Sequence, residues 1–355
     1  MWWVFLVACA RSPQPDLIVS DPDRSLVAHA GVLVTSFFVE GDAFAILVDG
    51  DGEIRWSRKA DPGDRVARVK AARDATVLMG FTDPDHEEKA GVITRETLDG
   101  EVLSETVAPT LHHDLVELDG GEIAFFGHSF APVDVPGHGV LPLATDTVRV
   151  GPEGGDSAIR FDYLQNYPVE PYWTCSHMNR GDHIEGVNEW THSNSLVPAE
   201  DGGWMLMARY LDAIVKLDAD FEVQWQLGGV GGTIDTGGVP LFRHAHFSHG
   251  WADRILVFDN GWSHSGSPPI SRVVELEVDA AAGTAREIWS YAEPHGEYVS
   301  YLGDAKRLSN GNTLISWGPL SRLTEVTPEG EIVWRVDLDR TTGRAELWDA
   351  PLPQR

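Results

Sequence analysis

Histidines placed just ahead of apolar segments are the residues of this sequence best suited to chemistry. They precede segments 115–118, 196–197 and 255–258 and are His112, His113, His192, His244 and His246. Arg209 directly follows another apolar run, 204–208. An imidazole nitrogen can act as a nucleophile or move a proton, and a guanidinium can hold anion oxygens with paired N–H donors. If the fold brings them together, these residue types predict a site for a small tetrahedral anion.

Other interpretations of the same residues stay open. Each histidine could be a hydrogen-bonded structural residue, and Arg209 could serve only in a salt bridge. A zinc site is a further alternative, but the set has neither an H-x-x-x-H pair on a helix nor a cysteine partner, so we expect no metal. Because side chains alternate along a strand, at most one of His244 and His246 would point into a shared channel.

The segments that must position these residues have the pattern of short strands. Alternating apolar runs recur between Gly, Asn and Asp residues, and no long stretch has the spacing of an amphipathic helix. The 36 glycines and 21 prolines suit many turns and exclude a helical bundle. Hairpin turns of the Asp-Gly or Asn-Gly type precede strands at 122, 204 and 313. A second repeated unit ends on a tryptophan, at Trp56, Trp225, Trp289 and Trp334.

A recurring hairpin followed by tryptophan is typical of propeller blades, in which the tryptophan packs between neighbours. We predict an all-β fold, a six-bladed β-propeller over residues 28–355, with its third blade enlarged by 132–168. The innermost strands would line a channel and bring the histidines to one mouth. The enlarged blade, including Trp173, His177 and His183, could cover that mouth or form a surface insertion.

The charge of the chain limits its partners. It has 27 Lys+Arg and 55 Asp+Glu, a formal net charge of −28. Nucleic-acid binders and polybasic membrane-binding proteins both need cationic surface, so we exclude these classes. An anionic substrate would need a local cationic site that acts against the field of the whole protein.

The N-terminus resembles a bacterial lipoprotein signal. Residues 1–8 form a short apolar run, and Leu6-Val7-Ala8-Cys9 has the form of the site where such signals are cut and the cysteine is lipidated. We predict a signal over 1–8, lipidation at Cys9 and a tether over 9–27, with no membrane contact other than this anchor. The location would be extracytoplasmic, on the periplasmic side. Cys175 would then be a lone thiol, so no internal disulfide is expected.

Seven sequence motifs, in this order, resemble those of the bacterial arylsulfotransferases, which do not use the nucleotide sulfate donor. The motifs run from residue 112 to 273, and the wider match reaches Trp334. They are His112-His113-Asp114, Trp190-Thr191-His192-Ser193-Asn194-Ser195, Ala208-Arg209-(x4)-Ile214-Val215-Lys216-Leu217-Asp218, Trp225-(x2)-Gly228-Gly229, Phe242-(x3)-His246, Phe258-Asp259-Asn260-Gly261 and Ser271-Arg272-Val273.

The resemblance implies a six-bladed propeller in which a channel histidine is transiently sulfated. By motif, the nucleophile corresponds to His246, with His244 as the alternative. The supporting groups correspond to His113, His192 and Arg209, and the individual roles of the two histidines stay open. His112, His244 and Asn194 are expected to contact the substrate.

The predicted function is therefore that of an aryl-sulfate sulfotransferase, which moves a sulfuryl group from an aryl sulfate donor to a phenolic acceptor without a cofactor. One alternative is a non-catalytic propeller lipoprotein that serves as a ligand-binding or scaffold module. A quinone- or metal-dependent propeller oxidoreductase is disfavoured, because the sequence has no ligand set for either group.

Overall fold

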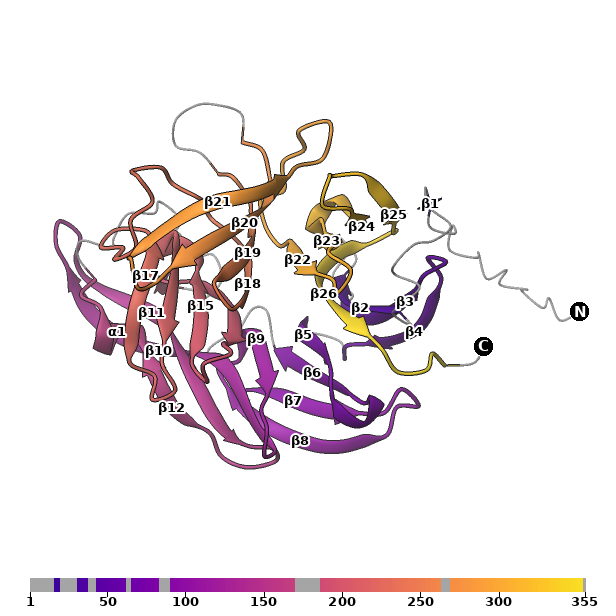
Figure 1. Cartoon of the computed structure of the whole chain (residues 1–355). Helices are drawn as coiled ribbons and strands as arrows, with labels where there is room; N and C mark the ends of the chain where they lie inside the picture. Colours follow the sequence, from indigo (N-terminus) through magenta and orange to yellow (C-terminus); the bar gives the residue numbers. More distant parts are fainter. Residues whose placement is uncertain are drawn as a thin grey trace, which may run out of the picture.

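The structure is a computed structural model that describes residues 16–19, 31–37, 43–61, 65–82, 90–169, 186–262 and 269–353. Its sheets form six blades in a ring (Figure 1), which confirms the predicted all-β propeller. Within the described residues, no helix is both long enough and apolar enough to cross a bilayer.

Each blade is a largely antiparallel sheet that runs from an innermost to an outermost strand. Blade one contains β26 (Thr341–Trp348), β2 (Gly31–Phe37), β3 (Ala43–Asp49) and β4 (Ile54–Lys59). Blade two contains β5 (Arg65–Ala71), β6 (Val77–Thr82), β7 (Ala90–Glu96) and β8 (Val102–Pro109). Blade three contains β9 (His112–Glu117), β10 (Glu122–Val135), β11 (Gly139–Pro152) and β12 (Ala158–Asp162), with β13 (Asn188–Glu189) parallel to β11.

The other three blades follow in chain order. Blade four contains β14 (Ser193–Pro198), β15 (Trp204–Ala208), β16 (Ala213–Leu217) and β17 (Val223–Gly228). Blade five contains β18 (Phe247–Trp251), β19 (Arg254–Asp259), β20 (Arg272–Asp279) and β21 (Thr284–Tyr291). Blade six contains β22 (Asp304–Arg307), β23 (Thr313–Ser316), β24 (Arg322–Val326) and β25 (Ile332–Asp337), with β1 (Asp16–Val19) at its outer edge. The short helices are α1 (Tyr163–Asn166) and the 3-10 turns η2 (Arg73–Ala75), η4 (Arg209–Leu211) and η5 (Gly318–Leu320).

Side chains alternate along a strand, so each blade directs one set of side chains toward each of its two neighbouring blades, and both sets are buried. In β2, Leu33 packs with residues of blade two, whereas Val32 and Val34 pack with residues of blade six. The same division gives an apolar cluster between each pair of adjacent blades in the described part of the chain. This packing fixes the innermost strands, which contact one another around the ring (Figure 1).

The tryptophans of the predicted repeat lie on the fourth strands of their blades, and three of them bond to the next blade. Each indole Nε1 donates to a carbonyl in the turn between the third and fourth strands of that blade: Trp56 to Leu98 at 2.8 Å, Trp289 to Pro328 at 2.7 Å and Trp334 to Gly50 at 2.9 Å. The repeated tryptophan therefore links neighbouring blades, as the sequence predicts.

The two ends of the described chain both join the ring. β26, the last strand, pairs with β2 and becomes the innermost strand of blade one (Figure 1). Counting repeats along the chain does not predict this closure, because it assumes that every blade is contiguous in sequence. β1, which falls within the predicted tether 9–27, pairs with β25. The predicted signal 1–8 and Cys9 lie outside the described residues.

The enlargement of the third blade is a long hairpin. β10 and β11 pair along their whole length, from Glu122 opposite Pro152 to Val135 opposite Gly139. The predicted enlargement 132–168 thus begins in this hairpin and continues through β12 and α1. Trp173, Cys175, His177 and His183 lie outside the described residues.

The buried carboxylate of Asp114, in the innermost strand β9, joins four blades. It accepts from Arg68 Nε of blade two at 3.1 Å, from Arg344 Nη1 of blade one at 2.6 Å and from the Leu196 amide of blade four at 2.8 Å. Burial alone would raise the pKa of Asp114, but Arg344, Lys70 and Arg68 hold it below its ordinary value. The aspartate of the His-His-Asp motif therefore has a structural role in holding the blades together.

Candidate active site

Three histidines in or just ahead of innermost strands share an uncommon backbone conformation. His113 in β9, His192 just before β14 and His244 ahead of β18 have φ of 49°, 49° and 50°. Residues other than glycine seldom adopt this left-handed region, at a cost of about 1 to 3 kcal/mol. Such conformations persist where the surrounding contacts over-determine them, and they cluster at functional sites.

His246 lies directly before β18 and is buried, and its ring is held on one side. Its Nδ1 is 2.7 Å from Asn260 Oδ1, and Asn260 Nδ2 donates to the carbonyls of Val299 and Leu302 at 2.7 and 3.0 Å. Since these two bonds turn Oδ1 toward the ring, we assign the hydrogen to Nδ1 and the lone pair to Nε2. Arg209 Nη1, which also lies against Nδ1, then acts on the ring through its charge and not as a hydrogen-bond donor to that nitrogen. Burial, followed by the charge of Arg209, lowers the pKa of His246 well below its usual range, so the ring is neutral at pH 7.

Arg209 begins η4, and its guanidinium lies against the His246 ring. Nη1 contacts His246 Nδ1 and donates to the His244 carbonyl at 2.7 Å and to Asn260 Oδ1 at 3.2 Å. Nη2 donates to the Ser300 carbonyl at 2.8 Å. These acceptors fix a positive charge beside the histidine that motif matching assigns as the nucleophile.

His113 and His192 lie together although they belong to different blades. Their ring centroids are 4.6 Å apart. His192 Nδ1 is 2.8 Å from Glu189 Oε2, whereas His113 Nδ1 is 2.9 Å from Nδ1 of the neighbouring His112. One ring is therefore paired with a carboxylate and the other with an imidazole.

The buried carboxylate of Asp146 lies beside His112, the ring that contacts His113. His112 Nε2 and His128 Nδ1 lie 3.3 and 3.4 Å from its Oδ1. Burial would raise the pKa of Asp146, but His112 and His128 outweigh that effect and lower it. The ligand-type atoms of these three residues lie within 4.8 Å of one another, as in a metal site.

The relative orientation of the His112 and His128 rings tests whether these residues could bind a metal ion. His112 and His128 stack with centroids 4.0 Å apart and planes at 5° to each other. An imidazole lone pair lies in the plane of its ring. Two parallel stacked rings therefore cannot both direct a lone pair at one ion, and the geometry favours a carboxylate shared by two imidazoles. The expected absence of a metal stays a prediction.

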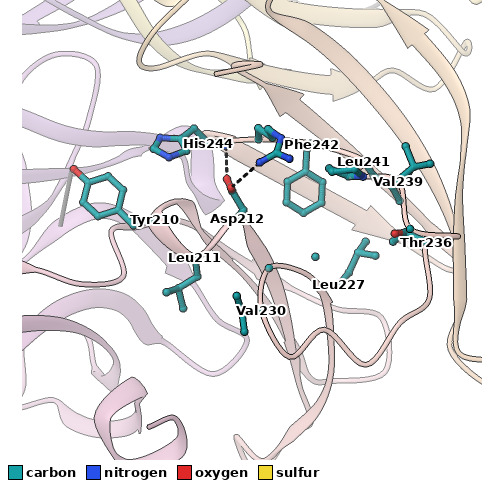
Figure 2. A pocket seen from close by; sticks show the side chains of 15 residues that line it. Tyr210, Leu211, Asp212, Leu227, Val230, Thr236, Val239, Leu241, Phe242 and His244 are labelled. Atoms are coloured by element: carbon teal, nitrogen blue, oxygen red, sulfur yellow. Dashed lines mark hydrogen bonds and ion pairs between the residues drawn. The ribbon is translucent and has the colours of Figure 1, made fainter. Parts of the chain in front are cut away.

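A cavity of about 480 Å³ lies next to these groups, between the end of β17 and the segment that leads to β18 (Figure 2). Much of its wall is apolar and is formed by Leu211, Leu227, Val230, Val239, Leu241 and Phe242. Tyr210 and His244 also line it, and Tyr210 stacks on His192 with centroids 4.6 Å apart. The cavity thus adjoins the histidine cluster, and its volume suits an aromatic ligand.

Asp212 carries the charged part of the cavity wall. Its Oδ1 accepts from the His244 amide at 2.6 Å (Figure 2), and its Oδ2 is 3.9 Å from Nη1 of the neighbouring Arg243. Burial raises the pKa of Asp212. The bond to the amide holds His244 in its left-handed conformation.

Comparison with known proteins bears directly on this arrangement. Residues 20–339 match the family described as Arylsulfotransferase (ASST). The chain belongs to the arylsulfotransferase family. None of the curated protein sequences matches it.

Solved structures are similar to this arylsulfotransferase-family chain in fold alone. A protein of unknown function from Bacteroides caccae has a TM-score of 0.53 at 13% identity, over 90% of this chain and 100% of that one. A streptogramin B lyase has a TM-score of 0.47 at 9% identity, over 91% and 87%. The periplasmic gluconolactonase of Pseudomonas aeruginosa has a TM-score of 0.47 at 14% identity, over 90% and 98%.

The motifs that carry the family resemblance meet around His246. Asp259 Oδ1 accepts from the Arg243 and Gly261 amides at 2.8 and 2.9 Å, and its Oδ2 lies 3.2 Å from Arg272 Nε. The Phe-Asp-Asn-Gly and Ser-Arg-Val motifs are thus joined by an ion pair. Gly228 has φ of 82°, and a Cβ there would lie 2.5 Å from the Asp212 carbonyl, so the Gly-Gly motif permits a close approach of two chain segments.

The predicted site residues come together from blades three, four and five. His113 contacts His192 and Arg209 contacts His246, and the Arg209 amide joins the two pairs by donating to the His192 carbonyl at 3.2 Å. His244 turns to the cavity and to Trp262, whose ring is 4.7 Å away. His244 and His246 precede β18 instead of lying on a strand, so the argument from strand alternation does not apply. Their functional roles stay predictions.

Two other predicted contacts have structural partners. Asn194 Nδ2 donates to the Ala245 carbonyl at 3.0 Å and so ties β14 to the segment of His246. His112 connects His113 with Asp146. Sequence reasoning missed Asp146, which lies in the enlarged third blade away from any quoted motif. It also missed Glu189, although this residue directly precedes the Trp190 motif and lies three residues before His192. Asn260 was within a motif but had not been assigned a role.

Proposed function

We propose that this chain is an aryl-sulfate sulfotransferase that works by a ping-pong mechanism through a sulfated His246. The observation that carries the proposal is the environment of this ring, which is buried, neutral, held at Nδ1 by Asn260 and adjacent to the Arg209 charge. A neutral imidazole with its lone pair at Nε2 can attack sulfur and later act as the leaving group.

In the first half-reaction, His246 Nε2 forms a bond to the sulfur of an aryl sulfate while the bond from sulfur to the aryl oxygen breaks. The electron pair leaves with the aryl oxygen, which takes up a proton to give the phenol. In the second half-reaction, an acceptor phenol gives up its proton and its oxygen displaces His246 from sulfur. Sulfuryl transfer, like phosphoryl transfer, depends mainly on positioning and on stabilising the oxygens of the transferred group, a role that suits Arg209.

The aryl group would occupy the cavity next to the histidine cluster. Tyr210 and His244 provide aromatic faces at the side near His192, and Leu241 and Phe242 provide apolar surface beyond them. Apolar walls with a few polar groups are typical of sites for aromatic ligands. This placement lets the phenolic oxygen lie near the histidines while the ring is removed from water.

The test is sulfuryl transfer from 4-nitrophenyl sulfate to added phenol, with an intact-mass scan for an added SO₃ in the absence of acceptor. We expect turnover that requires phenol and an adduct that His246→Ala abolishes. An adduct that survives in His246→Ala but is lost in His244→Ala would reassign the nucleophile. Neither turnover nor adduct across several phenols would favour the scaffold or ligand-binding alternative.

We also propose that the mature chain is anchored by lipid at Cys9, on the extracytoplasmic side. The support is the Leu6-Val7-Ala8-Cys9 segment that ends the apolar run. Metabolic labelling with palmitate should mark the wild-type chain in a bacterial host, and Cys9→Ser should remove both the label and membrane association. Equal labelling of the two chains would contradict the anchor.

A further inference from the structure

Glu189 stands out because it places a buried carboxylate in contact with one of the two histidines whose roles the family motifs leave open. It lies in β13, beside Ala144 of β11, and 5% of its surface is exposed. Its Oε2 is 2.8 Å from His192 Nδ1. An ionised carboxylate has no hydrogen to donate, so this ion-pair contact favours the ring form with its hydrogen on Nδ1. Any proton that His192 exchanges with a substrate must then be carried at Nε2.

The segment around His192 is clamped so that this pairing is maintained. Asp146 Oδ2 accepts from Thr191 Oγ1 at 2.8 Å and from the Ser193 amide, and the Asp146 amide donates back to Thr191 Oγ1 at 3.0 Å. Both chain neighbours of His192 are therefore bonded to one buried carboxylate. This clamp accounts for the left-handed backbone of His192 and fixes the direction of its ring.

The partners of the three rings differ in charge. His246 faces the neutral amide of Asn260, and His113 faces the ring of His112, whereas His192 faces a carboxylate. A neutral partner orients a ring without stabilising a charge on it. A carboxylate stabilises the imidazolium that forms when the ring takes up a proton, as in hydrolase triads. His192 is thus in direct contact with a group that supports proton transfer, whereas His113 is linked to the carboxylate of Asp146 through His112.

We propose that Glu189 is a positioning residue that makes His192 the proton carrier of both half-reactions. This inference rests on the proposed sulfotransferase function. In the first half-reaction, the proton on His192 Nε2 passes to the departing phenolate oxygen as the bond from sulfur to oxygen breaks. In the second, the proton of the acceptor phenol returns to Nε2 as its oxygen attacks sulfur. The cycle thus leaves His192 as it began, and it consumes no other reactant.

The dependence on the leaving group tests this role. A phenolate whose phenol has a low pKa, such as 4-nitrophenolate, leaves without protonation, whereas unsubstituted phenolate needs a proton in the transition state. Single-turnover experiments without acceptor report the first half-reaction alone. There we expect Glu189→Gln to lower the rate constant of enzyme sulfation by phenyl sulfate at least about tenfold, since general acid catalysis contributes about 10²- to 10⁴-fold. For 4-nitrophenyl sulfate we expect a much smaller loss, with the half-saturating concentration unchanged for both donors. A plot of the logarithm of this rate constant against leaving-group pKa should therefore be steeper for Glu189→Gln than for the wild type.

Glu325→Gln is the matched control, because Glu325 is also a buried carboxylate but lies in β24 of blade six, where it accepts from Asn312. It should leave the slope unchanged. Should Glu189→Gln not fold, Glu189→Asp takes its place, because it keeps the carboxylate but withdraws it from Nδ1. It should steepen the plot in the same direction. Equal losses for all donors, or no loss, would overturn the role of Glu189 while leaving the sulfotransferase function intact. A wild type without transfer and without an SO₃ adduct would refute both.

Discussion

Replacing Asn260 by aspartate tests whether the neutrality of His246 depends on its amide partner. The substitution keeps the shape of the side chain but puts a negative charge at the oxygen that lies 2.7 Å from His246 Nδ1. In the wild type, burial and then Arg209 lower the pKa of His246, and the Asn260 bond only partly opposes them. A carboxylate at this distance typically moves the pKa of its partner by about 1 to 3 units toward the charged form.

At about 1.4 kcal/mol per unit, Asn260→Asp should stabilise the imidazolium by about 1.4 to 4 kcal/mol. An imidazolium has no lone pair at Nε2, so formation of the sulfated enzyme should be lost on the acid side. The loss should begin about 1 to 3 pH units higher than in the wild type. The assay is the burst of 4-nitrophenolate in single-turnover experiments between pH 5 and 9, without acceptor.

The control for this experiment is Asn310→Asp. Asn310 lies in a blade-six turn, where its Oδ1 accepts from the Asn312 amide at 3.1 Å, a bond that aspartate retains. It adds the same charge far from His246 and should leave the pH profile in place. An Asn260→Asp enzyme that folds and has the acid limb of the wild type would refute the assignment of Asn260 as the direct partner of His246 Nδ1.

Four further outcomes are expected. Leu241→Trp should fill part of the cavity and lower kcat/KM for 2-naphthol more than for phenol; equal losses would separate the cavity from the acceptor site. Asp114→Asn leaves the buried Arg68 and Arg344 without their carboxylate and should lower the free energy of unfolding in urea by about 3 to 5 kcal/mol at pH 7. The difference from the wild type should become smaller under acid conditions, because the wild-type carboxylate is then itself protonated. Burial, with help from Lys306, lowers the pKa of His249 from 6.5 to about 4, so between these pH values the unfolded chain binds a proton that the folded chain does not. The free energy of unfolding should therefore decrease as pH falls through this window, by at most about 3 kcal/mol. His249→Gln should flatten this dependence of the free energy of unfolding on pH. Gly228→Ala should cost more than about 1 kcal/mol by thermal unfolding, because φ is 82° and the new Cβ meets the Asp212 carbonyl; an unchanged melting temperature would contradict that reasoning.

The sequence was most informative where the evidence is local. The Asp-Gly and Asn-Gly turns and the terminal tryptophans recur along the chain, so the blade repeat could be counted, and the indole bonds of Trp56, Trp289 and Trp334 explain why it recurs. The ordered motifs also identified the family that the comparison shows. The closure by β26 could not be read in this way, because its partner β2 lies at the other end of the chain.

The same distinction holds at the candidate site. The motifs contain His113, His192, Arg209 and His246, because each belongs to a short pattern of residue types that can be read along the chain. The choice between His244 and His246 depends on where each ring points, and that follows from the left-handed turn at His244 and from the bonds of Asn260.

By itself, then, the sequence determined the repeat, the family and the residue types available for chemistry, since these depend on order and composition along one chain. Only the tertiary structure decided which oxygen faces which imidazole. Asp146 and Asn260 meet histidines that are distant in sequence, at distances that sequence spacing does not encode. Glu189 lies only three residues before His192, but spacing alone does not show that the two side chains meet. The protonation and orientation of the rings follow from those contacts, because burial and the charge of the nearest partner determine where a proton resides.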